Sequence, residues 1–271
     1  MVDLSIILIT WNSERFVVNC LESVLAATNG ISREIILVDN GSADATRDLL
    51  QPYIRSGQIA TFVPRPTNGG VAKARNEGIR KANGRYIWLL DVDTVVNERA
   101  VRTLFDWMET NPGCGICGCK LFNSQGNVQD SCRKYPSFRF KLYNVLSSLL
   151  AKTGLLDWFK QRIDALNESQ FYHTRMAGSQ PFQVEYIIGA CQLIRAEVIV
   201  KTGLLDEHIF YGPEDADFCL RAAKEGWEVH YLPQVSFIHE YQQITNKRLF
   251  SRMSWIHTQA LFYFFWKHKL L

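Results

Sequence analysis

Three carboxylates in the N-terminal half come directly after apolar segments of strand length. Asp39 follows residues 34–38, and Asp91 and Asp93 come after residues 85–90. Ligands on a parallel sheet bind beyond the carboxyl ends of the strands, so we expect the three acids to converge there. Alternate residues of an extended segment point opposite ways, which lets one carboxylate of Asp91 and Asp93 hold a hard divalent cation while the other binds a polar ligand group. The competing interpretation for each acid is a helix cap or a closed turn.

A second group of acids lies in the C-terminal half. Glu214, Asp215 and Asp217 crowd the first turn of a helix predicted for residues 213–225. Carboxylates at this position interact favourably with the helix dipole, which is one explanation for them. They also suit a general base held near an acceptor hydroxyl. Asp217 and Arg221 are spaced i, i+4, which predicts an ion pair with a structural role.

A histidine and a glycine loop complete the candidate chemistry. His239 ends a strand predicted for residues 235–239, and beside a carboxylate-lined edge it could complete a metal shell or contact a phosphate. The loop Asn68-Gly69-Gly70 opens a helix that carries Arg75 in its second turn. Backbone N–H groups and this cation could face an anionic phosphate, although a plain helix start also explains the pattern.

These residues are positioned by a regular alternation of strand and helix patterns. The apolar periodicity predicts strands at residues 4–10, 34–38, 59–63, 85–90 and 114–122, and helices at residues 13–27, 42–53, 70–83 and 97–110. The alternation resumes from residue 184 with predicted helices at 196–201 and 213–225 and a strand at 229–239. This pattern predicts an α/β fold with a mostly parallel central sheet and right-handed crossovers.

Two aromatic and basic segments interrupt or follow this pattern. Residues 138–172 are predicted to form a helical insertion, which either packs on the core or lies on a membrane as a basic amphipathic surface. Residues 241–271 are predicted to form a helical tail, rich in aromatic residues, after a catalytic domain at residues 1–240. The two segments are candidates for peripheral contact with a membrane, or for burial against each other in a homodimer.

Composition limits the classes of protein. The 271 residues are 47% hydrophobic and 21% charged, which excludes a disordered, collagen-like or coiled-coil chain. Thirty basic against 27 acidic residues give a net charge of +3, too small to argue for a nucleic-acid partner. An odd number of cysteines, seven, and an N-terminus without signal-peptide features favour a cytoplasmic location. No apolar run is long enough to span a bilayer.

Two familiar motifs are present in the wrong context. Gly113-Cys-Gly115-Ile-Cys-Gly118 matches the dinucleotide fingerprint, but it follows a predicted helix and leads into a strand, whereas a true fingerprint follows a strand and opens a helix. The same segment contains a C-x-x-C pair, the second motif, but no other cysteine pair lies nearby to complete a zinc site. We therefore expect this segment to be a buried core strand.

Taken in order, six motifs of the chain resemble those of a known family. They are Ser5-Ile-Ile-Leu-Ile-Thr-Trp-Asn12, Val38-Asp-Asn-Gly-Ser42, Asn68-Gly-Gly70 with Ala74-Arg-Asn76, Asp91-Val-Asp93, Gly189-Ala190, and Glu214-Asp215 with Asp217 and Arg221. Together they resemble the GT-A glycosyltransferases of family 2, and most nearly the rhamnosyltransferase-like branch that builds polysaccharide and O-antigen chains. Trp11 stands where many relatives carry tyrosine, and Val92 interrupts what is often a run of acids.

The resemblance implies an inverting hexosyltransferase that uses Mg²⁺ or Mn²⁺. It would move a sugar from a nucleotide diphosphate donor, dTDP-rhamnose or a UDP-sugar, to a saccharide or lipid-linked saccharide acceptor at the inner face of the membrane. By position, the resemblance makes Asp215 the base, assigns Glu214 and Tyr211 to the acceptor, and assigns Asp93 and His239 to the metal. The positions that it assigns to the nucleotide sugar are Thr10, Trp11, Asn12, Asp39, Asn40, Asn68, Arg75 and Asp91.

Two other functions fit parts of the pattern. A nucleotidyltransferase also combines an α/β sheet with a carboxylate-bound metal, but it should carry a glycine-rich phosphate loop after the first strand, and Thr10-Trp-Asn-Ser13 is not one. A nucleotide-sugar-binding module without catalytic activity is the alternative outside the enzymes. Retention of Asp93, Asp215 and His239 argues against it.

Overall fold

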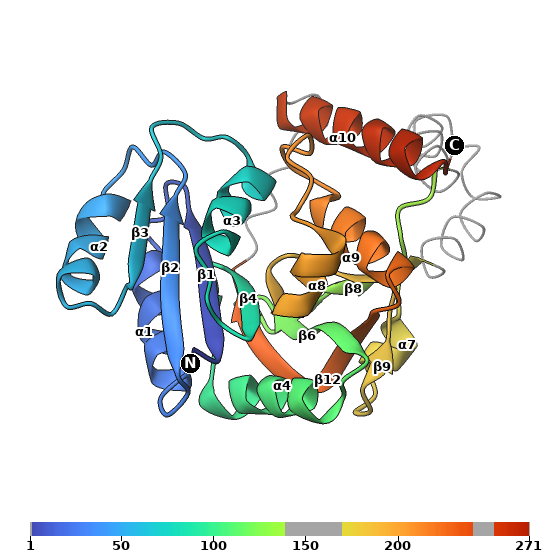
Figure 1. Ribbon diagram of the computed structural model, residues 1–271, viewed down its shortest axis with the longest axis horizontal. Helices are drawn as coiled ribbons and strands as arrows, with labels where there is room; N and C mark the ends of the chain where they lie inside the picture. Colours follow the sequence, from blue (N-terminus) through green and yellow to red (C-terminus); the bar gives the residue numbers. More distant parts are fainter. Residues whose placement is uncertain (1, 139–169, 241–251, 271) are drawn as a thin grey trace.

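The computed structural model of the protein describes residues 2–138, 170–240 and 252–270 (Figure 1). In the first half, strands and helices alternate close to the positions predicted from the sequence. The strands are β1 (Leu4–Thr10), β2 (Arg33–Asp39), β3 (Thr61–Pro64), β4 (Tyr86–Asp91), β5 (Thr94–Val95) and β6 (Cys114–Phe122). The helices are α1 (Val17–Ala27), α2 (Thr46–Arg55), α3 (Val71–Ile79) and α4 (Glu98–Thr110).

The second half combines short strands with three longer elements. Its strands are β7 (Val128–Gln129), β8 (Cys132–Arg133), β9 (Phe182–Gln183), β10 (Tyr186–Ile187), β11 (Cys191–Arg195) and β12 (Glu228–His239). Its helices are α7 (His173–Met176), α8 (Ala196–Thr202), α9 (Glu214–Lys224) and α10 (Arg252–His268). Most of the helical insertion predicted for residues 138–172 lies outside the described residues, because these omit 139–169.

Within the described residues, one sheet of ten strands runs through the molecule. Its order is β3-β2-β1-β4-β11-β6-β12-β5, with β7 beside β6 and β9 beside β12. The predicted parallel arrangement holds for β3-β2-β1-β4 and for the pair β6 and β12. β11 enters between β4 and β6 and runs antiparallel to both, which makes the sheet mixed. The α/β class is therefore confirmed, and its first four strands have the parallel order that gathers loops at one edge.

Helices cover both faces of the sheet and bury two apolar clusters. One cluster joins alternate residues of β1 and β4 to α1 and α4, and the other joins the opposite side chains to α3, α8, α9 and α10. Strands buried on both faces are nearly continuous apolar runs, as the sequence of β1 shows. The sheet thus lies between two layers of helices, and the polar residues lie at the edge where its loops gather.

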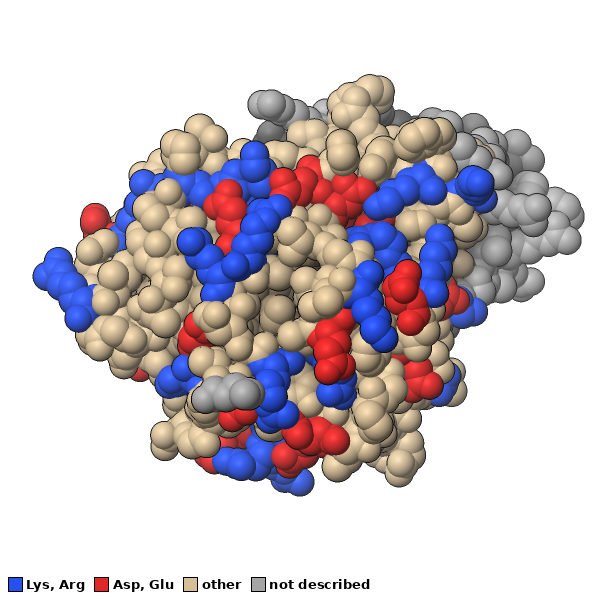
Figure 2. Space-filling model, viewed as in Figure 1, with Lys and Arg blue, Asp and Glu red and all other residues tan. Residues whose placement is uncertain are grey.

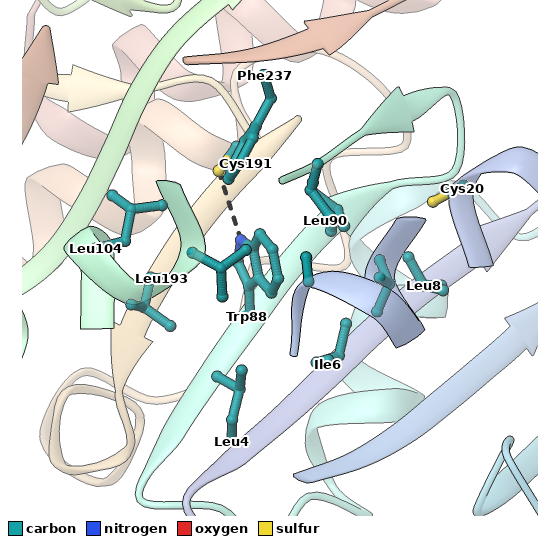
Figure 3. Close-up of a cluster of buried hydrophobic side chains, with 14 of the residues drawn as sticks. Leu4, Ile6, Leu8, Cys20, Trp88, Leu90, Leu104, Cys191, Leu193 and Phe237 are labelled. Atoms are coloured by element: carbon teal, nitrogen blue, oxygen red, sulfur yellow. Dashed lines mark hydrogen bonds between the residues drawn. The ribbon is translucent and has the colours of Figure 1, made fainter. Parts of the chain in front are cut away.

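The first cluster is centred on Trp88 of β4 (Figure 3). Trp88 is 1% exposed, and its indole N–H, which needs a partner when buried, donates to Cys191 Sγ at 3.4 Å. Leu4, Ile6 and Leu8, which point to the same face of β1, belong to this cluster as well. All seven cysteines are free and buried. The segment with the false dinucleotide fingerprint is β6, as expected.

Helix α10 is fastened to the body of the protein by ionic contacts as well as by its apolar face. Asp217 of α9 is fully buried and lies 2.8 Å from Arg221, 2.6 Å from Lys267 and 2.8 Å from His268. The predicted i, i+4 pair is confirmed, but two of the partners come from α10, about fifty positions away in the chain. None of the helices in the described ranges combines the length and apolar character that a membrane-spanning segment requires.

Asp217→Asn is expected to destabilise the protein by roughly 3 kcal/mol, because removing one partner of a buried ion pair leaves the other charges uncompensated. Chemical denaturation of both proteins near neutral pH measures the difference. Asp48→Asn, at an exposed position of α2, is the matched control and should shift stability by no more than about 0.5 kcal/mol. Equal losses for the two variants would contradict the role of Asp217.

The stability of the protein at acidic pH should also depend on the ion pairs of Asp217. Burial by itself raises the pKa of Asp217, but Arg221 and Lys267 outweigh it and hold the pKa below its usual value. A carboxyl with a lowered folded pKa stabilises the protein above its unfolded pKa of about 3.9 and loses this contribution as pH falls through the folded pKa. Below about pH 4, the stability of the wild-type protein should therefore approach that of Asp217→Asn.

Candidate active site

The register of the parallel strands brings three of the predicted residues to one edge. Thr10 at the end of β1 is paired with Asp39 of β2, and Ile9 is paired with Asp91 of β4. Asp39 is fully buried, and Thr10 Oγ1 donates to its Oδ1 at 2.9 Å. Arg47 of α2 forms an ion pair with its other oxygen. Arg47 is not predictable as part of the site, because nothing in the local sequence pattern links it to Asp39.

Two asparagines tie neighbouring loops together beside Asp39. The Asn40 side chain donates to Asn68 Oδ1 at 3.0 Å and to Gly70 O at 3.2 Å, and its own Oδ1 accepts from Gly69 N at 3.1 Å. Gly70 has φ = 91°, and a Cβ there would collide with the backbone of Phe210. The loop before α3 is therefore fixed both to the end of β2 and to the segment that precedes α9.

The loop after β1 lines a hollow on the surface. Asn12 has the unusual φ of 51°, which places its N–H 2.9 Å from Ser42 Oγ and its Oδ1 2.8 Å from Ala43 N. The hollow has a volume of about 740 Å³ and is lined by Asn12, Glu14, Arg15, Phe16, Ala43, Asp44 and Glu240. Trp11, which precedes Asn12 in the chain, is 50% exposed. A large exposed aromatic ring is available here for stacking on a flat ligand group.

Asp91, Asp93 and His239 form a cluster that can hold a metal ion. One ligand atom from each lies within 4.8 Å of the others. His239 Nε2 is 3.2 Å from Asp93 Oδ1 and 3.9 Å from Asp91 Oδ2. Two carboxylates and an imidazole suit Mn²⁺ or Mg²⁺. Burial lowers the pKa of His239, but the hydrogen bond to Asp93 and the charges of Asp93 and Asp91 together outweigh burial and raise the pKa.

The two carboxylates do not diverge as the extended geometry predicted. The chain turns at Val92 and Asp93 directly after β4, so both acids face the same point. The short strand β5 then pairs with the end of β12, with Thr94 opposite His239, and Glu240 N donates to Asp93 O at 2.9 Å. This pairing, which the sequence does not indicate, is what delivers His239 to the two acids.

Arg75 connects the metal-ligand cluster to the acids of α9. It is 3% exposed, and its Nη2 donates to Asp91 Oδ1 at 2.7 Å and to Gly189 O at 2.8 Å. Its Nη1 lies 3.7 Å from Glu214 Oε1. A Cβ at Gly189 would collide with the guanidinium group, so glycine is required for this approach. Arg75 is therefore a buried residue that links two loops, and not a surface cation at the start of α3.

Asp215 is held by the same segment. Its Oδ2 accepts from Gly189 N at 3.1 Å and its Oδ1 from Ala216 N at 2.7 Å, and the residue is 9% exposed. Burial raises the pKa of Asp215, while the backbone N–H groups and the charge of Arg133 oppose the rise. Burial and the neighbouring Asp215 raise the pKa of Glu214 to about 8. Two adjacent carboxyl groups with raised pKa values are typical of an acid and base site.

Two further residues shape the surroundings of these acids. Arg133 of β8 lies close enough to influence Asp215, and the ring of Phe171 packs against its guanidinium group at 5.8 Å. No motif in the sequence marks Arg133. Tyr211 precedes α9, with its ring 6.3 Å from that of His257 of α10. On the face shown in Figure 2, basic and acidic side chains are interspersed, so this face has no large patch of a single charge.

The structure thus brings the predicted residues to one region of the loop edge. Asp39, Asp91 and Asp93 follow parallel strands of one sheet, and Asp215 is linked to Asp91 through Arg75. The family model described as glycosyl transferase family 2 matches residues 5–203, nearly three quarters of the chain. The chain therefore belongs to glycosyl transferase family 2.

Individual relatives agree with this family. The chain is 36% identical over 236 residues to an uncharacterized glycosyltransferase, EpsJ, of Bacillus subtilis (strain 168), covering 87% of this chain and 60% of EpsJ. It is 26% identical over 230 residues to the poly-beta-1,6-N-acetyl-D-glucosamine synthase of Staphylococcus aureus (strain COL), covering 85% of this chain and 48% of the synthase. The chain thus spans less than two thirds of the length of these curated relatives.

A solved structure supports the fold. The mannosyltransferase PcManGT of Pyrobaculum calidifontis, in complex with GDP-Man and Mn²⁺, is similar with a TM-score of 0.63 and 15% identity. The match covers 98% of this chain and 63% of that one. At this identity the likeness is one of fold, and it confirms the expected GT-A architecture.

Proposed function

We propose that the chain is a metal-dependent, inverting glycosyltransferase that moves a hexose from a nucleotide diphosphate donor to a saccharide hydroxyl in cell-surface polysaccharide synthesis. The family supports sugar transfer, and a relative named as a polysaccharide synthase supports a saccharide acceptor. Membership of this family argues against a nucleotidyltransferase. Residues 1–240 are proposed to be the catalytic unit and residues 241–271 its helical tail.

One observation carries the proposal: a continuous chain of contacts joins the metal-ligand cluster to the proposed base. Arg75 Nη2 bonds to Asp91 and to Gly189 O, and Gly189 N bonds to Asp215. A transferase of this kind needs a cation at the diphosphate and a carboxylate at the acceptor hydroxyl, held at a fixed separation. This chain of hydrogen bonds supports such an arrangement.

The proposed roles combine the contacts of the site with the family resemblance. Asp91, Asp93 and His239 would hold Mg²⁺ or Mn²⁺, which when bound stabilises negative charge on the departing diphosphate. Asp215 removes the proton from the acceptor hydroxyl, whose oxygen attacks the anomeric carbon from the side opposite the leaving group. A single displacement of this kind inverts the configuration. Glu214 and Tyr211 are proposed to orient the acceptor beside Asp215.

The donor is proposed to bind along the ends of β1, β2 and β4. Thr10 with Asp39, and Asn40 with Asn68, are fixed polar pairs at this edge. Asn12 lines the adjacent hollow, and Trp11 precedes it in the chain. Arg75 and Asp91 then lie between the nucleotide and the acids of α9. We propose dTDP-rhamnose or a UDP-sugar as the donor, because the sequence resembles the rhamnosyltransferase-like branch.

A panel of nucleotide sugars tests the function. Thermal shift with dTDP-, UDP- and GDP-sugars in the presence of Mn²⁺ should identify one donor that stabilises the protein, since a ligand that binds only the folded state raises its stability. Hydrolysis or transfer of that donor, with inversion seen by NMR of the product, completes the test. Binding without turnover towards any saccharide would support a binding module, and no binding at all would overturn the proposal.

A lipid-linked acceptor is the finer part of the proposal. Trp255, Phe262 and Trp266 of α10 are 65%, 55% and 68% exposed, and their spacing places them on one face of the helix. On its opposite face the same helix reaches Gly212, where a Cβ would collide with His257, so the helix that carries the proposed membrane face adjoins the segment before α9. We propose that α10 lies on the inner leaflet, with tryptophan at the interface.

Replacing Trp255, Phe262 and Trp266 together by serine should lower affinity for anionic vesicles at least tenfold, since roughly 100 Å² of lost apolar contact is worth about 2.5 kcal/mol. Vesicle sedimentation measures this. Val200→Ser is the matched control, because Val200 is an 85% exposed apolar residue on α8. Unchanged sedimentation would remove α10 as an anchor, and a dimer that dissociates only in the triple variant would assign the face to a homodimer.

A further inference from the structure

We propose that Gln129 fixes the tautomer and orientation of His239, so that Nε2 is the nitrogen left to bind the metal. The inference rests on the metal site of the proposed function and adds a residue that no sequence motif marks. Gln129 acts through His239 and is therefore a positioning residue. The residues named above for the proposed function are instead assigned to direct contact with the metal, the donor or the acceptor.

Two hydrogen bonds carry the inference. Gln129 Nε2 donates to the backbone oxygen of His239 at 2.8 Å. A carbonyl oxygen accepts only, so this contact identifies the amide nitrogen and fixes which way the amide faces. Gln129 Oε1 then lies 2.7 Å from His239 Nδ1. An amide oxygen also accepts only, so Nδ1 must carry the hydrogen.

The consequence falls on the other ring nitrogen. When a cation takes the place of the hydrogen that Nε2 shares with Asp93, the imidazole keeps its hydrogen on Nδ1 and offers the lone pair of Nε2. His239 Nε2 faces Asp93 Oδ1 at 3.2 Å and Asp91 Oδ2 at 3.9 Å. Metal-binding histidines commonly donate their second N–H to a fixed acceptor, which sets the tautomer and the direction of the ring. Gln129 provides that acceptor here.

The fold builds this contact from a hairpin. β6 turns at residues 123–127, where Asn123 N donates to Asn127 O, and β7 returns antiparallel with Gln129 opposite Leu121. β12 runs beside β6, with Ile238 opposite Phe122. The hairpin therefore lays Gln129 across the end of β12, where it contacts both the ring and the backbone of His239.

Mn²⁺ affinity of the metal-free protein, measured by electron paramagnetic resonance without donor or acceptor, tests the role. Gln129→Met keeps the length of the side chain but removes both hydrogen bonds, and it should weaken Mn²⁺ binding about 10- to 100-fold. Gln125→Met is the matched control, because Gln125 is exposed on the same hairpin, and it should bind as the wild type does. Wild-type affinity in Gln129→Met would overturn the inference.

A second measurement separates tautomer control from loss of structure. Nitrogen-15 NMR of the Mg²⁺-loaded protein, in which the cation has replaced the hydrogen on Nε2, should find the hydrogen of His239 on Nδ1 in the wild type and a mixture of ring states in Gln129→Met. Gln129→Glu, which keeps an acceptor for Nδ1 but cannot donate to the backbone, should retain more Mn²⁺ affinity than Gln129→Met. An Nε2–H tautomer in the Mg²⁺-loaded wild type would overturn the inference, whereas failure of the wild type to bind Mn²⁺ would overturn the metal site itself.

Discussion

Asp215→Asn is expected to lower kcat by about 10²- to 10⁴-fold, the usual worth of a positioned general base. An asparagine side chain fills the same space but cannot take a proton from the acceptor hydroxyl. Because Asp215 is not among the residues proposed to bind the donor, the affinity for the nucleotide sugar should change little. Single-turnover transfer rates, together with donor binding by calorimetry, separate the two effects.

Glu214→Gln provides the comparison for this variant. Burial and the charge of Asp215 raise the pKa of Glu214 to about 8, so near pH 7 this side chain is mostly protonated and already resembles glutamine. Its substitution should therefore cost much less activity than that of Asp215. If the two variants lost equal activity, or if Glu214→Gln lost more, the assignment of the base would be wrong.

The pH profile of the wild type should have a matching form. A general base works when it is deprotonated, and burial raises the pKa of Asp215 above its usual value. The acidic limb of kcat/KM should therefore rise with pH through a pKa above the ordinary value of about 3.9 for aspartate. In Asp215→Asn this limb should disappear from the residual activity.

Asp93→Asn is expected to abolish metal-dependent transfer, with a rate loss on the order of 10³-fold. The loss of one charged ligand from a set of three weakens the hold on the cation, and a bound cation is worth several kcal/mol where charge develops in the reaction. Mn²⁺ titration of the transfer rate and direct Mn²⁺ binding should show parallel losses. Chelation of the wild type should reproduce the effect, and added Mn²⁺ should reverse it.

Asp206→Asn supplies a charge-matched control for that experiment. Asp206 is bonded to Lys267 and Tyr263 of α10, and it does not belong to the metal-ligand cluster of Asp91, Asp93 and His239. Its substitution should leave Mn²⁺ affinity unchanged even if the protein becomes less stable. Full transfer activity of the wild type in a strong chelator would contradict the metal role of Asp93.

The strand ends were predictable because their signal is local. Apolar runs of strand length that stop at Asp39 and Asp91 define two parallel strands, one on each side of β1, and parallel strands must present their ends at one edge. The cluster of acids at the start of α9 was recognisable as a candidate for a general base, but only the family resemblance singled out Asp215. The mixed character of the sheet could not be predicted, because nothing in the sequence of residues 191–195 specifies an antiparallel position between β4 and β6.

The partners of the predicted residues were harder to predict from the sequence. Arg47 and Gln129 are ordinary polar residues in their own segments, and they matter because of what lies opposite them. The same holds for the end of α10: the sequence marks Lys267 as one basic residue in an aromatic tail, whereas the structure places it beside the buried Asp217. Contacts of this kind join segments that can lie more than a hundred residues apart, as Gln129 and His239 do.

The sequence by itself determined the α/β class, the order of the main elements and the residue types available for sugar transfer, because periodicity, strand ends and helix starts are properties of short segments. The tertiary structure alone decided that Asp91 and Asp93 face the same side, that His239 joins them, and that Arg75 lies between them and Asp215. Those arrangements depend on a turn after β4, the pairing of β5 with β12, and a glycine at position 189. Such long-range packing fixes where side chains meet, which no local pattern encodes.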